Sequence, residues 1–189
     1  MRQLILLFLV LLFKTGYTQQ FNDLDKSPMD AVMMRDLDNS SLIRIVYSRP
    51  YKRNRKIFGE LVKYDTLWRT GANEATEIRL YKDALINGEK LEKGTYTLFS
   101  IPHEEEWTII INNAEKSWGL EAYEEGNDVL RTKVSSMLTA TSVEQFSISL
   151  RRNGKKYSLL MGWDDRFVLV PIEFLREENA TIENKNEEF

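Results

Sequence analysis

Residues 146–172 read FSISLRRNGKKYSLLMGWDDRFVLVPI, and they give the sharpest structural prediction in the chain. Asn153-Gly154 lies between two runs that alternate apolar and polar residues. Asn-Gly is a strong signal for a two-residue hairpin, because a type I′ turn needs positive φ at both central positions. With the turn at these residues, Arg152 is expected to face Lys155. The facing apolar pairs are then Leu150 with Tyr157, Ile148 with Leu159 and Phe146 with Met161, all on one side of the hairpin.

A second tight turn is predicted at Asp164-Asp165, and it extends the hairpin to a three-stranded meander with one continuous apolar side. The expected neighbours across this turn are Val168 beside Met161, Val170 beside Leu159, and Ile172 beside Tyr157. Pro171 has no N–H to donate to a neighbouring strand, so it predicts that the last strand lies at a sheet edge.

Short runs rich in β-branched and aromatic residues predict further strands upstream. They cover residues 41–48, 76–81, 94–101, 107–112 and 128–135. Asn87-Gly88 predicts another hairpin, between residues 84–86 and 89–91. Residues 113–125 break the pattern and are expected to form a long loop or a short helix. Many short strands with turn signals and little helix predict an all-β fold, an antiparallel β-sandwich, with a partly open β-barrel as the alternative.

The N-terminus has the layout of a secretory signal peptide, predicted to cover residues 1–18. Arg2 precedes the apolar run LILLFLVLLF (4–13), and small and polar residues follow up to Thr18. The run is shorter than the roughly 20 apolar residues that span a membrane, so the mature chain is expected to have no transmembrane anchor. The expected localisation is therefore exported, either periplasmic or extracellular.

The rest of the chain divides into three predicted parts. Residues 19–40 are polar and are expected to form an N-terminal arm with one helical turn. Residues 41–175 form the predicted β-rich domain, which is long enough to bury a core of its own. Residues 176–189 are dominated by Glu, Asn and Lys, and they are predicted to be disordered because they carry too little apolar surface to offset chain entropy.

Composition excludes several kinds of chemistry. The 189 residues contain no cysteine, which removes thiolate catalysis, thiolate metal ligands and disulfides. The formal net charge of −3 argues against a nucleic-acid partner. His103 is the only histidine, so neither a zinc site nor a Ser-His-Asp triad is expected. The acidic cluster at residues 121–128 is interpreted as a solvated loop, and no metal ion or cofactor is predicted.

The densest polar motif is WRTGANEAT at residues 68–76, which is expected on a loop before a strand. Arg69 can donate to a carboxylate or a phosphate, and Trp68 can stack on a sugar or an apolar ligand. Asn73 and Glu74 can bind hydroxyl groups. The motif therefore predicts a ligand site, with no catalytic residue assigned.

A structural alternative is open for the same motif. In that interpretation Arg69 and Glu74 form an internal ion pair, and Trp68 anchors the core. A second guanidinium, from the block YSRP at residues 47–50, ends an upstream strand and joins the candidate site. The full set of candidate ligand-binding residues is Arg49, Trp68, Arg69, Asn73 and Glu74.

Several blocks of the chain resemble the family of domains of unknown function DUF2911. The blocks are YSRP (47–50), KIFG (56–59), LWRTGANEAT (67–76), GTYTLFSIP (94–102), the strand at 107–112 and WG (118–119), in the same order. The resemblance extends from Ile45 to Phe174. It implies an exported bacterial protein, typically from Bacteroidetes-like organisms, and it brings no known activity, substrate or catalytic residue.

Three functions remain open from the sequence. The leading hypothesis is a non-enzymatic envelope module that binds a small molecule or a glycan through the loop residues. The first alternative is a structural or assembly partner whose strand edges pair with other proteins. The second alternative is a hydrolase that uses Glu74 as an acid or a base.

Overall fold

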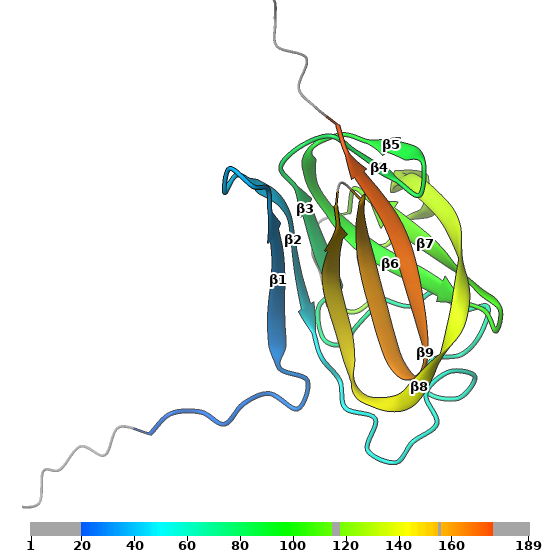
Figure 1. The fold of residues 1–189 in the computed structure, drawn as a ribbon. Helices are drawn as coiled ribbons and strands as arrows, with labels where there is room; N and C mark the ends of the chain where they lie inside the picture. Colours follow the sequence, from blue (N-terminus) through cyan, green and yellow to red (C-terminus); the bar gives the residue numbers. More distant parts are fainter. Residues whose placement is uncertain (1–19, 115–117, 155, 176–189) are drawn as a thin grey trace, which may run out of the picture.

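The computed structural model of the chain describes residues 20–114, 118–154 and 156–175 (Figure 1). Within them, the strands are β1 (Met29–Arg35), β2 (Ser41–Ser48), β3 (Thr76–Leu80), β4 (Ala84–Ile86), β5 (Glu89–Leu91), β6 (Gly94–Pro102), β7 (Glu106–Asn112), β8 (Asp128–Asn153) and β9 (Lys156–Phe174), with a 3₁₀ turn at Glu125–Asn127. They form one antiparallel sheet in the order β1-β2-β3-β6-β7-β8-β9-β4-β5, which does not close into a barrel. The predicted all-β antiparallel fold with little helix is confirmed.

The sheet folds over itself because β8 bends (Figure 1). The first half of β8 pairs with β7, from Ser135 opposite Glu106 to Leu130 opposite Ile111. Beyond Leu138 the register shifts, and the second half of β8 (143–153) pairs with β9. Irregular pairing of this kind bends a strand, so one continuous sheet can make both layers of a sandwich. One layer holds β1, β2, β3, β6 and β7, and the other holds the second half of β8 with β9, β4 and β5 (Figure 1).

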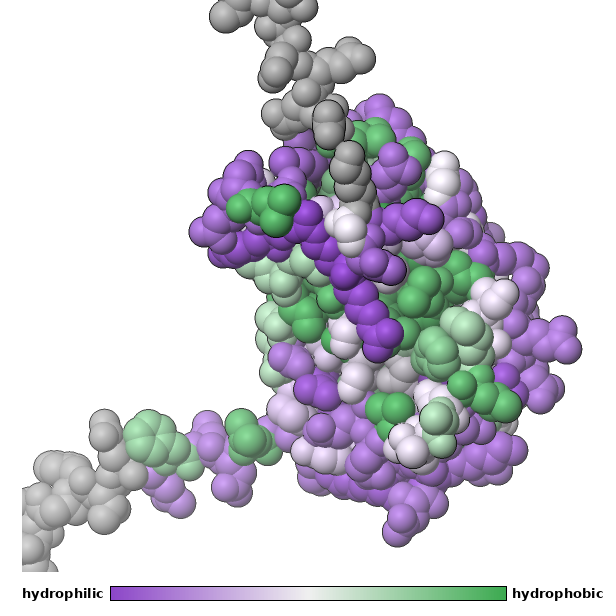
Figure 2. Space-filling model, viewed as in Figure 1, coloured by the Kyte–Doolittle hydropathy of each residue, from purple (hydrophilic) through white to green (hydrophobic). Residues whose placement is uncertain are grey.

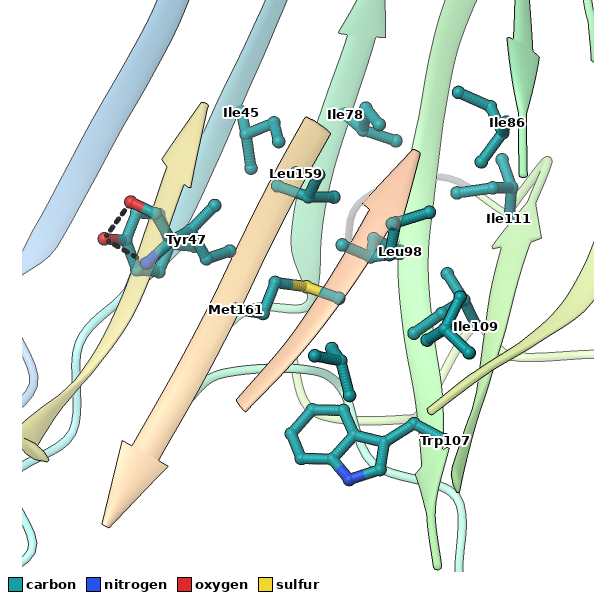
Figure 3. Packing of buried hydrophobic residues seen from close by; sticks show 14 of the residues in the cluster. Ile45, Tyr47, Ile78, Ile86, Leu98, Trp107, Ile109, Ile111, Leu159 and Met161 are labelled. Carbon is teal, nitrogen blue, oxygen red and sulfur yellow. Dashed lines mark hydrogen bonds between the residues drawn. The ribbon is translucent and has the colours of Figure 1, made fainter. Parts of the chain in front are cut away.

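The hydrophobic core lies between the two layers, as the close view in Figure 3 shows. The first layer contributes Ile45, Ile78, Leu98 and Ile109, and the second contributes Leu159 and Met161. Each of these side chains is at most 2% exposed. Burying one such side chain stabilises the fold by roughly 1.5–3 kcal/mol. The core explains why a chain without disulfides holds this fold.

The hairpin between β8 and β9 forms at the predicted place but in a different register. Leu150 lies opposite Leu159 and Arg152 lies opposite Tyr157, a shift of two residues from the prediction. Asn153 pairs with Lys156, so the predicted turn centred on Asn153-Gly154 is wrong. Side chains alternate with a period of two, so a two-residue shift leaves every apolar residue on its predicted side. The hydrophobic pattern therefore cannot reveal the shift.

The strand β9 turns back on itself at Asp164, whose φ is +52°. Gly162 lies against Phe167, since a Cβ added at Gly162 would come within 3.0 Å of the Phe167 Cβ. This contact has the predicted register, in which Met161 lies beside Val168. Figure 1 shows the first limb of β9 (156–163) beside its final limb (166–174). The predicted turn at Asp164-Asp165 agrees with both observations.

The final limb of β9 is not a sheet edge, so the prediction drawn from Pro171 is wrong at this strand end. Ile172 lies opposite Ile86 of β4, and the Asn87 N–H donates to the carbonyl of Pro171 over 2.8 Å. Proline lacks a donor but keeps its acceptor, and only the acceptor is used here. The β4–β5 hairpin itself is as predicted, with φ of +50° at Asn87 and +89° at Gly88.

The N-terminal arm was expected to contain a helical turn, and it contains the strand β1 instead. Val32 lies opposite Ile45 of β2, and exposure alternates along β1 with a period of two. Val32 and Met34 pack against the core, while Met29 and Met33 face the solvent. The apolar spacing resembled one helical turn by coincidence, because an edge strand needs only a few inward residues.

Two predicted segments, the signal peptide (1–18) and the disordered tail (176–189), lie outside the described residues. Within residues 20–114, 118–154 and 156–175, no helix has the length and apolar character needed to cross a membrane.

Candidate functional site

The WRTGANEAT loop is held against β6 at its start. Trp68 and Ser100 form an antiparallel bridge, with backbone hydrogen bonds of 2.8 and 2.9 Å. The Thr70 and Ser100 hydroxyls are 2.9 Å apart, and the Thr76 hydroxyl donates to the Thr70 carbonyl over 2.6 Å. These hydroxyls are buried, so each hydrogen bond also avoids the cost of an unsatisfied polar group. The loop is therefore a rigid element of the fold.

Gly71 allows the tight path of this loop. Its φ is +155°, and an added Cβ would lie 3.1 Å from the Ser48 carbonyl oxygen and 3.2 Å from the Thr76 hydroxyl. Thr70 and Asn73 also have positive φ, of +54° and +56°. Such conformations persist only where the surroundings enforce them.

We expect Gly71→Ala to lower the free energy of unfolding by about 1–3 kcal/mol, because it adds a close contact to an unfavourable φ. Gly126→Ala is the matched control, since a Cβ there meets nothing within 4 Å. Urea denaturation measures the free energy of unfolding of both variants. Equal stability of the two would contradict the role given to Gly71.

Trp68 lies in the core and offers no open ring face. The residue is 8% exposed, and its indole N–H donates to the Gly71 carbonyl over 3.0 Å. Its ring stacks on Trp163 at 6.2 Å and meets Phe146 edge-on at 5.0 Å. Trp107 and Phe58 also contact it. Trp68 is therefore a core residue in this structure, and its ring does not line a surface on which a ligand could stack.

Arg49 and Asn73 are held by other parts of the protein. Arg49 donates to the Asp30 carboxylate and to the Ser147 hydroxyl, both over 2.9 Å, and so ties β1 to β8. The Asn73 side-chain amide donates to the Asp25 carboxylate over 3.0 Å. The main donors of both side chains are therefore occupied.

Arg69 and Glu74 differ from the other three candidates. Within the described part of the chain, neither side chain has a hydrogen-bond or ion-pair partner, and they do not pair with each other. Arg69 is half-buried, and burial lowers the pKa of its guanidinium. Its Nε is buried without an acceptor. An unsatisfied buried donor is costly and rare. The terminal guanidinium nitrogens are not among the buried atoms, so they are the donors that an acceptor from a ligand could reach.

The residue that completes this region is Trp118, which lies outside the motif predicted from the sequence. Trp118 is 59% exposed and forms an antiparallel bridge with Glu74. The Gly119 N–H donates to the Asn73 carbonyl over 2.9 Å. Directly opposed residues of an antiparallel pair project to the same side, with Cβ atoms about 4.5–5.5 Å apart. The Glu74 carboxylate and the Trp118 indole therefore flank each other on one surface, here called the Trp118 face.

A small second core supports the Trp118 face from the outer side of the first layer. It consists of Ala75, Phe99 and Ile110, with Leu67, Ile101 and Tyr123 packed against them. The Tyr123 ring meets Phe99 edge-on at 5.0 Å and so fixes the segment that follows Trp118. Strand alternation puts Arg69 on the same side as Leu67, opposite to Trp68. Arg69 therefore lies on the outer side of the first layer, next to Leu67 of the second core.

Two other charged features of the sequence, the acidic cluster and His103, form ion-pair contacts within the protein. Asp128 and Glu125, of the acidic cluster, bind Arg131 at 2.6 and 3.4 Å. The imidazole of His103 contacts the Asp65 carboxylate.

The comparisons with known proteins identify a family without an assigned function. A search of curated proteins and a search of solved structures each found no match. Residues 27–172 match the family described as "Protein of unknown function (DUF2911)", a range that includes β1 as well as the WRTGANEAT loop and Trp118. Since the match covers most of the sequence, the chain belongs to the DUF2911 family.

Proposed function

We propose that this chain is an exported, non-enzymatic β-sandwich module that binds a glycan on the Trp118 face. The observation that carries the proposal is the exposed Trp118 indole directly opposite a Glu74 carboxylate that has no partner within the described residues. An exposed tryptophan beside a free carboxylate matches the two sides of a sugar, which has apolar C–H faces and hydroxyl edges.

Each group has a definite part in the proposed complex. The sugar ring stacks on Trp118 through its C–H groups, a contact worth about 0.5–1.5 kcal/mol. A hydroxyl group donates to the Glu74 carboxylate in a charge-assisted hydrogen bond. Arg69, on the same loop, receives an acidic substituent of the sugar where one is present. The bridge between Glu74 and Trp118 presets both groups, so little conformational entropy is lost on binding.

The proposed compartment fits this ligand. The signal-peptide layout of residues 1–18 supports export, and the polymers of a bacterial envelope and its surroundings are rich in glycans. Mass spectrometry of the secreted chain tests this part, because export with cleavage leaves an N-terminus at Gln19 and an intact Met1 would contradict it.

A printed array of neutral and acidic oligosaccharides tests the binding itself. We expect the full chain to bind and Trp118→Ala to lose about two- to tenfold in affinity, as the loss of one stacked ring predicts. Tyr51→Ala, which removes another exposed aromatic ring, is the matched control and should bind like the unchanged chain. Failure of the full chain to bind any glycan would overturn the proposal.

Glu74→Gln separates binding from hydrolysis. The amide has nearly the shape of the carboxylate but no charge, so we expect weaker binding of the same glycans. Chromogenic glycosides provide the second measurement. Turnover by the unchanged chain that disappears in Glu74→Gln would establish the hydrolase alternative instead.

A further inference from the structure

The outer side of the second layer has an unusual composition. In the final limb of β9, Val168, Val170 and Ile172 point into the core and are at most 4% exposed. The residues between them, Phe167, Leu169 and Pro171, therefore point outward. An antiparallel sheet with one solvated face usually carries polar residues there, so an outward apolar column calls for an explanation.

This column borders two neighbouring hollows, here together called the outer groove. The larger has a volume of about 870 Å³ and is lined by Leu169, Pro171 and Leu85 of β4. The smaller, of about 260 Å³, is lined by Leu160 and Phe167. Arg151 lines both. Figure 2 shows apolar residues gathered in the middle of this surface with hydrophilic residues around them.

The outer groove is polar at one end and apolar toward the other. Arg151 lies opposite Ser158 near the β8–β9 turn. Two residues further along, Leu160 lies opposite Ser149, and Gly162 lies opposite Ser147 after that. The distance from Ser158 to Gly162 along the strand is about 13 Å at the usual rise per residue. The groove thus runs from a charged entrance to a floor formed by Leu160 and Phe167, with the Ser147 and Ser149 hydroxyls beside it.

The polar end is predominantly basic. Arg151, Arg152 and Lys156 line it, against one carboxylate, Glu173. Arg152 is engaged, since it donates to the Gly154 carbonyl over 3.0 Å and lies 5.5 Å from the Tyr157 ring centroid. Within the described residues, the side chains of Arg151 and Lys156 have neither a hydrogen bond nor an ion pair. Two unpaired cations on a chain of net charge −3 are complementary to an anion.

We propose that the outer groove binds a single-chain anionic amphiphile of the fatty-acid type. The carboxylate accepts hydrogen bonds from Arg151 and Lys156, and the acyl chain lies along Leu169 and Leu160 toward Phe167. The volume of the larger hollow is within the range of about 300–1,000 Å³ that small-ligand sites occupy, which favours a small molecule over a protein partner. The groove lies on the second layer and is independent of the Trp118 face.

Isothermal titration of the full chain with dodecanoate, below its micelle concentration, tests the proposal. We expect dodecanoate to bind about tenfold more tightly than dodecyltrimethylammonium, which has the same chain and a cationic head. Acetate, which has the head without the chain, should show no measurable binding. Equal affinity for the two dodecyl compounds would overturn the proposal.

The variant Arg151→Gln tests whether dodecanoate binds at the basic end of the outer groove. The Arg151 side chain is exposed and unpaired, so the variant should fold normally. It should bind dodecanoate about five- to tenfold more weakly, because it lacks the charged donor. Lys63→Gln, which removes an exposed cation elsewhere, and Trp118→Ala should bind like the unchanged chain. A matching loss in Lys63→Gln, or none in Arg151→Gln, would contradict the assignment.

Anionic vesicles of phosphatidylglycerol distinguish a free amphiphile from a membrane surface. Binding of the chain to vesicles without binding of monomeric dodecanoate would overturn the fatty-acid site in favour of membrane attachment. If the chain bound dodecanoate but no glycan, the proposed glycan-binding function would be wrong, and the proposal for the outer groove would still hold.

Discussion

Trp68→Ala should lower the free energy of unfolding by about 3–5 kcal/mol, the range for removing a buried tryptophan. The reason is its central place among aromatic rings. Trp163, Trp107 and Phe146 all lie within 6.2 Å of its ring centroid. The truncation removes these contacts and leaves a cavity between the layers. It also leaves the Gly71 carbonyl without the indole donor that holds the loop.

The matched control is Trp118→Ala, the same change at a residue that is 59% exposed. We expect it to alter the free energy of unfolding by no more than about 0.5 kcal/mol, as surface substitutions usually do. Urea denaturation followed by circular dichroism measures both. A Trp68→Ala variant as stable as the unchanged chain would show that Trp68 is not a core anchor.

The second large effect is expected at Asp164, which is 6% exposed. Its carboxylate accepts from the Lys52 ammonium at 2.6 Å, the Ser142 hydroxyl at 2.9 Å and the Ile57 N–H at 3.3 Å. It therefore ties the turn of β9 to the loop after β2. Asp164→Ala removes the acceptor of all three donors at once. It should lower the free energy of unfolding by about 2–4 kcal/mol.

The same carboxylate predicts a pH dependence. Burial by itself would raise the pKa of Asp164, but the hydrogen bonds from Lys52, Ser142 and the Ile57 amide outweigh it and lower the pKa below the ordinary 3.8. In acid the unfolded chain thus binds the proton more readily than the folded chain. The stabilisation is complete above the ordinary pKa and is lost as the pH falls through the lower pKa of the folded state.

Asp164→Asn isolates this charge, because asparagine keeps the side-chain shape and tolerates the φ of +52°. Urea denaturation from neutral to strongly acid pH measures the effect. The difference in free energy of unfolding between the unchanged chain and Asp164→Asn should shrink as the pH falls below the ordinary pKa of aspartate. If the free energies of unfolding of the two chains differed by the same amount at every pH, the Asp164 charge would not have the stabilising role given to it.

The sequence predicts the strands and the sandwich well because both depend on local signals. Asn87-Gly88 marks a hairpin by turn chemistry alone, and the alternation around Leu159 selects the inward face. The β8–β9 register could not be fixed, because a two-residue shift leaves that alternation unchanged. The strand β1 was missed because an edge strand carries few inward residues.

The candidate site was only partly predictable because exposure is a tertiary property. Trp68 and Trp118 are both tryptophans in polar surroundings, and only the packing of the two layers shows that the first is buried and the second exposed. The bridge between Glu74 and Trp118 joins positions far apart in sequence. The outer groove did leave a signal, since the run FVLVPI (167–172) is apolar at outward as well as inward positions.

Isothermal titration of the full chain with the strongest glycan from the array tests whether the Trp118 face is the binding site, with Trp118→Ala and Tyr51→Ala measured beside it. We expect equal affinity for the unchanged chain and Tyr51→Ala, and an affinity about two- to tenfold lower for Trp118→Ala at an unchanged thermal midpoint. An unchanged affinity in Trp118→Ala would show that the glycan binds elsewhere on the molecule.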